Sequence, residues 1–533
     1  MSNTARSLSV ASLIMMGSVL LSRVLGIARE LVLASFGGTS GQMDAYVAAF
    51  LIPEFLNHLL AGGFMSITFI PLFQKHLVAH DEPRAWRMFS NLFICGSLVM
   101  VVFVVLGLLF TRQILGLLGS RVGGAEIELA VRMTHLILPA QLFFYWGALL
   151  MAVQFAQKRF FVPALAPLFY NGGIIVGGMV LGPRLGIEGF AWGVLGGAFV
   201  GNVVVQLFGL RGLGMRFRFL MNFKDPDLIQ YVLISLPFIL GLGMQFSNEI
   251  AFRIFGSFLH EGGLASLNYS LRIMWVLVGL FGQAVGIASF PYLTRLAAEG
   301  KLSEMNKVAF GVLNHIGIML IPVSAVLMAL APETVAVVLQ RGRFTAASTA
   351  ATAPVLQLYL VGSFAFAAMT IVTRCFYALQ NTLLPMIVST LAAVGCLPLY
   401  WLFSLLWGAP GIALAGSIAA IVQLVAMTII WARRHGTGAP IGATLLVYLK
   451  TLAAGVLGYA VAWGLHTELW KISGLQHLRP LPANLSVVLV AGGAGLVVAY
   501  GALMALGVSD VKLLLTKVAK KAGLVPRVQP LQG

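Results

Sequence analysis

The feature that most constrains this chain is a series of long apolar segments joined by short connections. A helix needs about 20 mostly apolar residues to cross the hydrocarbon of a bilayer, and fourteen segments reach that length. A bilayer offers no hydrogen bonds to the backbone, and the segments are too long for barrel strands, so each is predicted to be a helix. The predicted spans are 8–36, 45–74, 88–110, 128–156, 162–182, 187–210, 228–255, 265–294, 308–331, 350–378, 384–407, 410–432, 446–465 and 484–507.

The composition agrees with a polytopic, all-α membrane protein. Only 10% of the residues are charged and 59% are hydrophobic, whereas soluble domains carry about 25% charged residues. The three cysteines, Cys95, Cys375 and Cys396, lie far apart in apolar runs, which indicates neither a disulfide framework nor a metal site. No nucleotide-binding, metalloprotease or nucleophile motif is present. The sequence therefore predicts a transporter without a cofactor, not an enzyme.

The basic residues in the connections predict the orientation. With the N-terminus in the cytoplasm, the cytoplasmic connections and tail hold twenty Lys and Arg residues and the outer connections hold seven. Lys and Arg concentrate on the cytoplasmic side of membrane proteins, so both termini are predicted to be cytoplasmic. The first span lacks a small-residue cleavage site and is expected to stay attached. This asymmetry accounts for most of the net charge of +17 without a nucleic-acid partner.

A weak internal repeat divides the spans. Copies about 220 residues apart are separated by six helices, so they point the same way through the membrane. Two parallel six-helix lobes around a central cavity form a known transporter plan. We predict an N-lobe at 1–220, a C-lobe at 221–440, two extra helices at 441–510 and a basic cytoplasmic tail at 511–533; a chance match of Pro and Gly is the alternative. The repeated pairs are Pro163 and Pro385, Gly189 and Gly411, and Pro71 and Pro291.

Ionisable residues at membrane depth gather in the first, second, seventh and eighth spans. Each costs about 2.5–3.5 kcal/mol at the centre of a bilayer, so their placement in corresponding members of the two lobes predicts one wet cavity. Arginine makes forked contacts to phosphates and carboxylates, which favours an anionic substrate. The set comprises Arg23, Arg29, Glu30, Asp44, Glu54, His58, Glu249, Arg253 and Arg272, while Arg132 and Arg374 lie near span ends and can reach the interface.

Some of these charges have simpler explanations. Arg29 and Glu30 are adjacent and could form a charge pair near the membrane edge. Glu249 and Arg253 have the i, i+4 spacing of an intrahelical ion pair. Arg272 has no acid within four residues on its helix, which favours a role in ligand binding.

The first span has a polar face of its own. Arg23 and Glu30 are seven residues apart, which places them on one helix face about 10 Å apart. Both could line a wet groove, although Arg23 could instead bond a buried carbonyl. Gly26 lies between them and permits a hinge or a close helix contact.

Several motifs resemble those of the lipid II flippases, the MurJ (MviN) family. The opening is the most specific, and the matches run in register over about residues 8 to 434. The motifs are "SRVLGIARE", "DAYVAAFLIPEFLNHLLAGGFMSITFIPLF", "KRFFVPALAPLFYN", "NYSLR" with "FPYL", "LQRGRFT" and "RCFYALQNTLLP".

The resemblance implies a multidrug/oligosaccharidyl-lipid/polysaccharide exporter that moves a lipid-linked peptidoglycan precursor. The movement would run from the inner to the outer leaflet of the bacterial inner membrane. The two helices at 441–510 would hold the polyprenyl tail, and Arg23, Arg29 and Arg272 would bind the pyrophosphate. Asp44 would belong to the same substrate site and act in gating or in head-group contacts. Expected partners are lipid II, membrane lipids and a cell-wall synthesis complex. Because the sequence has no ATP-binding motif, a gradient of a monovalent cation (Na⁺ or H⁺), the membrane potential or the substrate's own gradient would drive the cycle.

This sequence departs from the family pattern at several sites. Asn57, followed by His58, stands where the family has an arginine, and Leu271 and Trp275 replace acids around Arg272. Glu54, Glu249 and Arg253 stand where neutral residues are common. We therefore place Glu54, Asn57 and His58 in the predicted substrate site, and Glu249 and Asn381 are the candidate sites for a coupling cation.

Three alternatives to a lipid II flippase remain at this point. A related flippase for another polyprenyl-linked glycan fits the altered cavity. A drug/cation antiporter of the same superfamily would need a site for organic cations, which an arginine-lined cavity disfavours. A membrane scaffold that transports nothing would tolerate neutralisation of Arg23 and Arg272.

Overall fold

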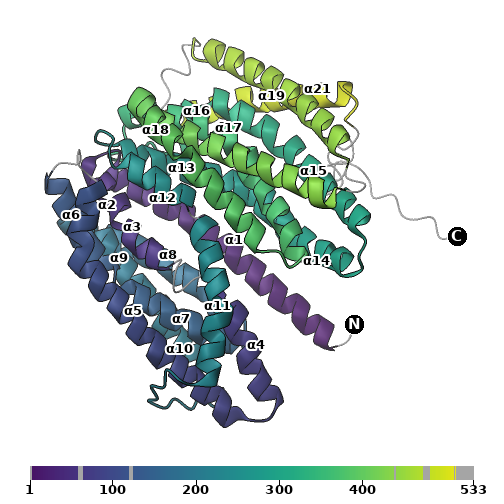
Figure 1. The fold of residues 1–533 in the computed structure, drawn as a ribbon. Coiled ribbons are helices and arrows are strands. Elements are labelled where there is room, and N and C mark those ends of the chain that lie inside the picture. The colour runs from purple at the N-terminus through teal and green to yellow at the C-terminus, as the bar shows by residue number, and fades with distance from the viewer. Residues whose placement is uncertain are drawn as a thin grey trace. The chain divides into compact units, whose positions relative to one another are not determined.

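The computed structural model describes residues 3–57, 64–118, 124–245, 247–436, 440–471, 480–508 and 511. Within these residues the chain is helical and contains no strand (Figure 1). Ten of the described helices are long and apolar enough to cross a membrane. The predicted class, an all-α multi-pass membrane protein, is therefore confirmed.

Each of the fourteen predicted spans overlaps one or more of the observed helices. The helices are α1 (Asn3–Gly37), α2 (Gly41–Ala49), α3 (Leu51–Leu56), α4 (Phe64–Val78), α5 (Glu82–Leu118), α6 (Gly124–Ile137), α7 (Ala140–Ala156), α8 (Phe161–Leu185), α9 (Glu188–Phe199), η2 (Val200–Val204), α10 (Val205–Gly209), α11 (Pro226–Gln245), α12 (Ser247–Gly256), α13 (Gly263–Val278), η3 (Gly279–Gln283), α14 (Ala284–Ala298), α15 (Leu302–Ala329), α16 (Ala331–Leu339), α17 (Ala346–Ala378), α18 (Leu383–His435), α19 (Ile441–Leu469) and α21 (Pro480–Ala505), with η marking π-helices.

Helix α18 contains two of the predicted spans, 384–407 and 410–432. Its only residue with non-helical backbone angles is Gly408, at φ 61° and ψ −132°. Pro410 follows two residues later and has no N–H to continue the helical ladder. The break between the two predicted spans therefore falls at the glycine.

The chain forms two compact units. The first contains Met1–Ser266 and Leu339–Ser348, and the second contains Leu267–Val338 and Thr349–Gly533. By packing, α11 and α12 belong to the first unit, although the repeat assigns them to the C-lobe. The lobe boundaries at 1–220, 221–440 and 441–510 describe the repeat and stay a prediction. Of the predicted basic tail, residues 512–533 lie outside the described part of the chain.

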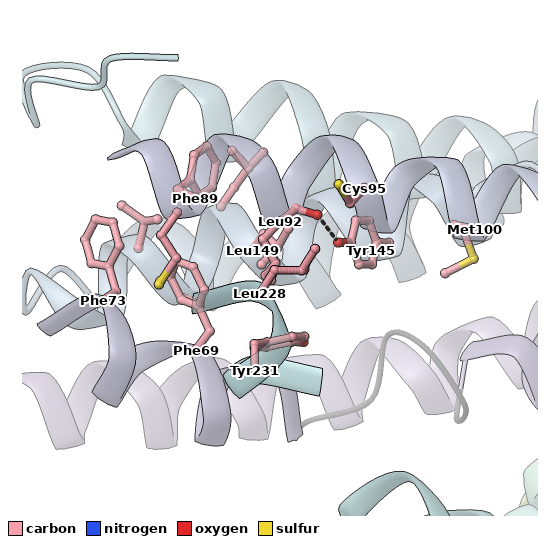
Figure 2. Packing of buried hydrophobic residues seen from close by; sticks show 14 of the residues in the cluster. Phe69, Phe73, Phe89, Leu92, Cys95, Met100, Tyr145, Leu149, Leu228 and Tyr231 are labelled. Atoms are coloured by element: carbon pink, nitrogen blue, oxygen red, sulfur yellow. Dashed lines mark hydrogen bonds between the residues drawn. The ribbon is translucent and has the colours of Figure 1, made fainter. Parts of the chain in front are cut away.

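An aromatic core explains why α11 packs with the first unit. Phe69 of α4 and Phe89 of α5 are fully buried, and Tyr231 of α11 joins the same cluster (Figure 2). Tyr145 of α7 donates its hydroxyl to the Leu92 carbonyl at 2.7 Å, so the one polar atom of that ring is satisfied inside the core (Figure 2). α11 is thus tied to α4 and α5 by shared burial.

The start of α11 follows from its sequence. Asp225 precedes Pro226, and its Oδ1 accepts the Asp227 amide at 2.9 Å, as an N-cap carboxylate does before a proline at the first helical position. Asp227 in turn lies 3.2 Å from His76 Nε2 and 3.2 Å from Arg84 Nε. The carboxylate therefore connects α11 to the end of α4 and the start of α5.

Helices α8 and α9 pack through their glycines. A Cβ atom added to Gly177 would lie 2.4 Å from Gly193 Cα, and one added to Gly173 would lie 2.4 Å from Gly197 Cα. Small residues at four-residue spacing allow backbones to approach closely, which replaces the hydrophobic driving force that lipid does not supply. Only glycine fits at these positions.

The last two helices belong to the second unit. α19 and α21 approach closely at Gly458 and Gly495, where a Cβ on either residue would lie 2.8 Å from the carbonyl oxygen of the other. Near the end of α19, His466 Nε2 lies 2.7 Å from the buried Glu333 carboxylate, and Trp470 Nε1 donates to the same oxygen at 3.1 Å. α19 is thereby fixed to α16.

Candidate functional site

The charges of the first span lie on the second half of α1. Arg29 Nη2 pairs with Glu30 Oε1 at 2.6 Å, and Arg29 Nη1 donates to Asn171 Oδ1 of α8 at 3.1 Å. The side chains of Arg29 and Glu30 are 17% and 13% exposed. Arg29 Nε is buried and has no hydrogen-bond partner among the described residues. The adjacent charge pair considered from the sequence is therefore present, and the role of Arg29 toward a substrate stays a prediction.

Arg23 lies two turns before Glu30 on the same helix and is exposed. α1 is one continuous helix through Gly26, and a Cβ added there would meet no atom within 4 Å. Gly26 therefore makes no close helix contact with the described part of the chain. Its role as a hinge stays a prediction.

The predicted second span begins with a kinked helix pair. α2 ends at Ala49 and α3 resumes after Phe50, because Pro53 has no N–H to donate to the Ala49 carbonyl. Thr134 Oγ1 of α6 donates to that carbonyl at 3.2 Å instead. The kink places Asp44 in the first turn of α2 and Glu54 in the first turn of α3.

Arg253 of α12 holds this kink. It is 6% exposed, its Nη1 donates to the Val47 carbonyl at 3.1 Å, and its Nη2 pairs with Glu54 Oε2 at 2.5 Å. The Val47 carbonyl belongs to the last turn of α2, where the Phe50 N–H reaches it only at 3.4 Å and the macrodipole favours a cation. Arg253 thus satisfies one helix end and one acid, and its charge is neutralised within the protein.

Asp44 binds backbone amides rather than a cation. Its Oδ2 accepts the Gly262 N–H at 2.6 Å and its Oδ1 accepts the Ala265 N–H at 2.6 Å, at the start of α13. Glu261, two residues before α13, makes the reciprocal contact, because its Oε1 accepts the Gly41 N–H at 2.8 Å, at the start of α2. Each helix therefore supplies the carboxylate that caps the other.

These contacts surround a small pocket of the first unit. Asp44 and Arg253 both line it, together with apolar side chains of α2, α3, α5, α6 and α13. Both charges are already hydrogen-bonded in the geometry given above. The pocket can therefore accept an apolar group more readily than an anion.

The remaining predicted residues are placed as follows. Arg272 lies on α13 in the second unit and is exposed, next to the buried Leu271, and the Trp275 ring packs against Phe366 at 5.8 Å. Asn381 Oδ1 accepts the Leu384 N–H at 3.1 Å, so it caps the start of α18.

Three further predicted residues lie at the edge of the described part of the chain or outside it. Asn57 is half-buried at the end of α3. His58 and the Glu249 side chain lie outside the described residues. The predicted pairing of Glu249 with Arg253 therefore stays a prediction, beside the observed pair of Arg253 with Glu54.

Apart from the pair of Arg29 with Glu30, sequence reasoning missed the partners of these charges. Asn171, which supports Arg29, was quoted only as the end of a motif, and Thr134 gives no signal as the donor to a freed carbonyl. Glu54 and Arg253 are almost 200 residues apart, so no local spacing reveals their pairing. The one sign of these contacts in the sequence is Pro53, which has no N–H to donate to the Ala49 carbonyl.

Comparisons with known proteins point to one family. A family model described as lipid II flippase MurJ matches residues 33–478. A probable lipid II flippase MurJ of Vibrio cholerae is 25% identical over 516 residues, covering 92% of this chain and 97% of that protein. A probable lipid II flippase MurJ of Rhizobium tropici is 27% identical over 429 residues, covering 78% and 80%.

Solved structures show the same fold. A lipid II flippase MurJ in an inward closed conformation superposes with a TM-score of 0.75 at 22% identity, covering 93% of this chain and 99% of that chain. An inward-facing multidrug resistance transporter of the MATE family gives a TM-score of 0.64 at 15% identity, covering 80% and 98%. At these identities the structures define the fold alone.

Proposed function

Because the chain belongs to the lipid II flippase MurJ family, we propose that it translocates lipid II from the inner to the outer leaflet of the bacterial inner membrane. The observation that carries the proposal is the family match over residues 33–478, which extends through both compact units. The relatives reported above are named probable lipid II flippases, which favours lipid II over another polyprenyl-linked glycan. The likeness to a MATE transporter concerns the fold only.

The chemistry of such a substrate suits an all-helical transporter of this composition. The pyrophosphate and sugars cannot cross hydrocarbon unaided, while the polyprenyl tail need not leave it. In the proposed cycle, the head group enters a wet cavity between the lobes and the tail remains in lipid, in part along α19 and α21. Alternating access then exposes the head group on the other side. Both termini would lie in the cytoplasm.

Arg23, Arg29 and Arg272 would bind the pyrophosphate. The exposure of Arg23 and Arg272 supports this role, and so does the Nε of Arg29, which has no hydrogen-bond partner among the described residues. Arg253 is a poorer candidate because its side chain is only 6% exposed and both of its Nη atoms already bind, one to Glu54 and one to the Val47 carbonyl, although its Nε, like that of Arg29, has no hydrogen-bond partner among the described residues. The proposed cationic set therefore excludes Arg253. Arg253 does not replace the arginine that the family has at the position of Asn57.

The driving force is also a proposal. A monovalent cation or the membrane potential would power the cycle, because no nucleotide-binding motif is present in the sequence. Of the two candidate cation ligands, Glu249 is preferred, because the side-chain oxygen of Asn381 already accepts the Leu384 amide.

Complementation of a bacterial strain depleted of its own lipid II flippase tests the function. The unaltered chain should restore growth, and Arg23→Gln or Arg272→Gln should abolish rescue at equal membrane levels. Arg295→Gln is the matched control, because Arg295 is 79% exposed beside Glu299 in a predicted cytoplasmic connection, and it should rescue fully. Failure of the unaltered, well-expressed chain would overturn the lipid II assignment.

A second measurement separates transport from a scaffold role. Lipid-linked precursor should co-purify with the unaltered protein and be identifiable by mass spectrometry, and less should co-purify with Arg272→Gln. A scaffold predicts no bound precursor and normal growth with either arginine neutralised.

A further inference from the structure

The connection between α10 and α11 has an unusual sequence for a loop. Residues 211–224 read "RGLGMRFRFLMNFK", with four basic residues and no acid. We call this segment the basic-aromatic linker. It forms neither helix nor strand, and apolar residues alternate with polar ones from Met215 to Lys224 except at Leu220. In an extended chain such alternation directs apolar and basic side chains to opposite sides.

The linker is fixed to the start of α5. Ser90 Oγ accepts the Arg218 N–H at 3.1 Å. Asn91 pairs with Asn222 twice, accepting its N–H at 2.8 Å and donating to its carbonyl at 2.9 Å. Ser90 is 0% exposed and Asn91 is 1% exposed. Buried side chains of α5 thus hold the linker by its backbone, while Leu213 and Met215 pack against the core and the side chains from Phe219 to Phe223 are left largely exposed.

The exposed side chains include three large apolar groups. Phe219 is 83% exposed, Met221 is 55% exposed and Phe223 is 53% exposed. Phe217 packs edge-on against Phe93 of α5, with the ring centroids 5.7 Å apart. Exposed phenylalanines are expected where a span meets lipid. Here they belong to a connection between spans, and basic residues alternate with them.

The position of the linker along the membrane normal explains why exposed phenylalanines and basic residues occur together in it. Ser90 and Asn91 lie within the first turn of the predicted span 88–110. Beyond them α5 exposes a continuous apolar face toward lipid, which includes Val102, Val105 and Leu109. The linker therefore lies at the level where hydrocarbon gives way to lipid head groups, the layer in which amphipathic segments with aromatic and basic residues bind.

We propose that the basic-aromatic linker binds anionic lipid at the membrane surface. Phe219, Met221 and Phe223 lie in the boundary between head groups and acyl chains, and the basic side chains of the linker contact lipid phosphates. Lipid fits better than an acidic protein because the apolar and basic groups share one segment at one depth. The placement in the cytoplasmic leaflet, whose surface is negative, rests on the proposed orientation. The lipid contact itself does not require transport.

Site-specific quenching of a fluorophore in the full-length protein tests this proposal. Cys95, Cys375 and Cys396 are buried, so a cysteine in Phe219→Cys can be labelled selectively with an environment-sensitive fluorophore. Ala79→Cys, on the exposed turn between α4 and α5, is the matched control facing water. Both proteins are placed in nanodiscs of phosphatidylcholine alone or with added phosphatidylglycerol. Iodide quenches fluorophores in water, and spin-labelled lipids quench those in the bilayer.

The expected result is a blue-shifted emission at position 219 and loss of iodide quenching, with strong quenching by spin-labelled lipid. Phosphatidylglycerol should increase the lipid quenching. Arg216→Gln, Arg218→Gln and Lys224→Gln combined should remove that increase while the thermal midpoint stays unchanged. The Ala79 site should respond to iodide in every nanodisc.

Three outcomes would overturn the proposal. Iodide quenching at 219 equal to that at 79 would place the segment in water. Lipid quenching that ignores phosphatidylglycerol would remove the anionic partner. Protection found only in native membranes would indicate a protein partner. Because none of these readouts measures transport, failure of complementation leaves the lipid contact standing.

Discussion

The two ends of the first unit are held together in different ways. At the predicted outer end, the carboxylates of Asp44 and Glu261 accept backbone amides, a set we call the outer contact. At the predicted cytoplasmic end, Asp227 faces the side chains of His76 and Arg84, a set we call the inner contact. The outer contact fixes backbone against side chain, whereas the inner contact joins side chains alone.

Glycines make the outer end still less adjustable. Gly38, Gly262 and Gly342 all have positive φ, and a Cβ on any of them would lie 2.4–2.5 Å from a carbonyl oxygen. At the inner end, Arg84 is 50% exposed and free to change rotamer. Backbone contacts of this kind are either made or lost, while long side chains can follow a movement. The outer end should therefore tolerate less movement than the inner end before its contacts are lost.

The largest effect is expected from Gly262→Ala. Gly262 has a φ of +82°, and a Cβ there would lie 2.4 Å from the Thr39 carbonyl oxygen. Backbone strain and the clash should cost about 3 kcal/mol, measured as a lower thermal midpoint in detergent. Gly300→Ala is the control, because its φ is +71° but no atom lies within 4 Å, and it should cost about 1 kcal/mol. Equal losses of stability in the two variants would show that the clash with the Thr39 carbonyl oxygen adds nothing to the cost of the backbone strain.

Asp44→Asn should come next. An asparagine keeps one acceptor but turns an amide nitrogen toward either the Gly262 or the Ala265 N–H, so a loss of about 2 kcal/mol is expected. Glu261→Gln keeps the single acceptor that Gly41 requires, and should cost less than about 1 kcal/mol. Thermal midpoints of the two variants measure the difference, and the reverse order would contradict the outer contact as described.

Asp227→Asn should destabilise less than Asp44→Asn. The charge partner Arg84 is half exposed and well solvated, so a loss of about 1 kcal/mol is expected. Because ion pairs are screened by salt, the difference from the unaltered protein should shrink at high ionic strength, whereas the loss from Gly262→Ala should not. If Asp227→Asn costs as much as Asp44→Asn, the distinction between the two ends fails.

The smallest effect concerns an exposed ion pair of the second unit, which gives a baseline for the inner contact. Glu299 accepts from Arg295 at 2.8 Å and lies 2.9 Å from Lys301 Nζ, and these cations lower the pKa of the carboxyl to about 2. Its pKa is lower when folded, so the small stabilisation is present above the ordinary carboxyl pKa and disappears as pH falls toward 2. Glu299→Gln should shift the thermal midpoint least of all variants. The shift should be present only at pH values above the ordinary carboxyl pKa.

Long apolar helices were predictable from the sequence because lipid imposes a length and a composition. The span 350–378 falls within α17, and the division between 384–407 and 410–432 falls at the positive φ of Gly408. The second predicted span was less regular than expected, because Pro53 removes one helical bond and divides α2 from α3.

The partners of the charges were not predictable in the same way. Arg29 with Glu30 is a local pair, and its adjacency was visible in the sequence. The pair of Arg253 with Glu54 depends on how α12 packs against α3, which no periodicity encodes. Asp44 resembled a gating acid by its place in a motif, but its amide partners at the start of α13 required coordinates.

The glycine face between α8 and α9 has a mechanical consequence. Where two helices touch backbone to backbone, no layer of side chains remains that can change rotamers and let one slide along the other. Displacing the register would bring bulky neighbours such as Phe190 against the opposite main chain, since its ring already fills the space beside Gly178. The pair of α8 and α9 should therefore move as one rigid body, so that a displacement of either helix is transmitted directly to the other.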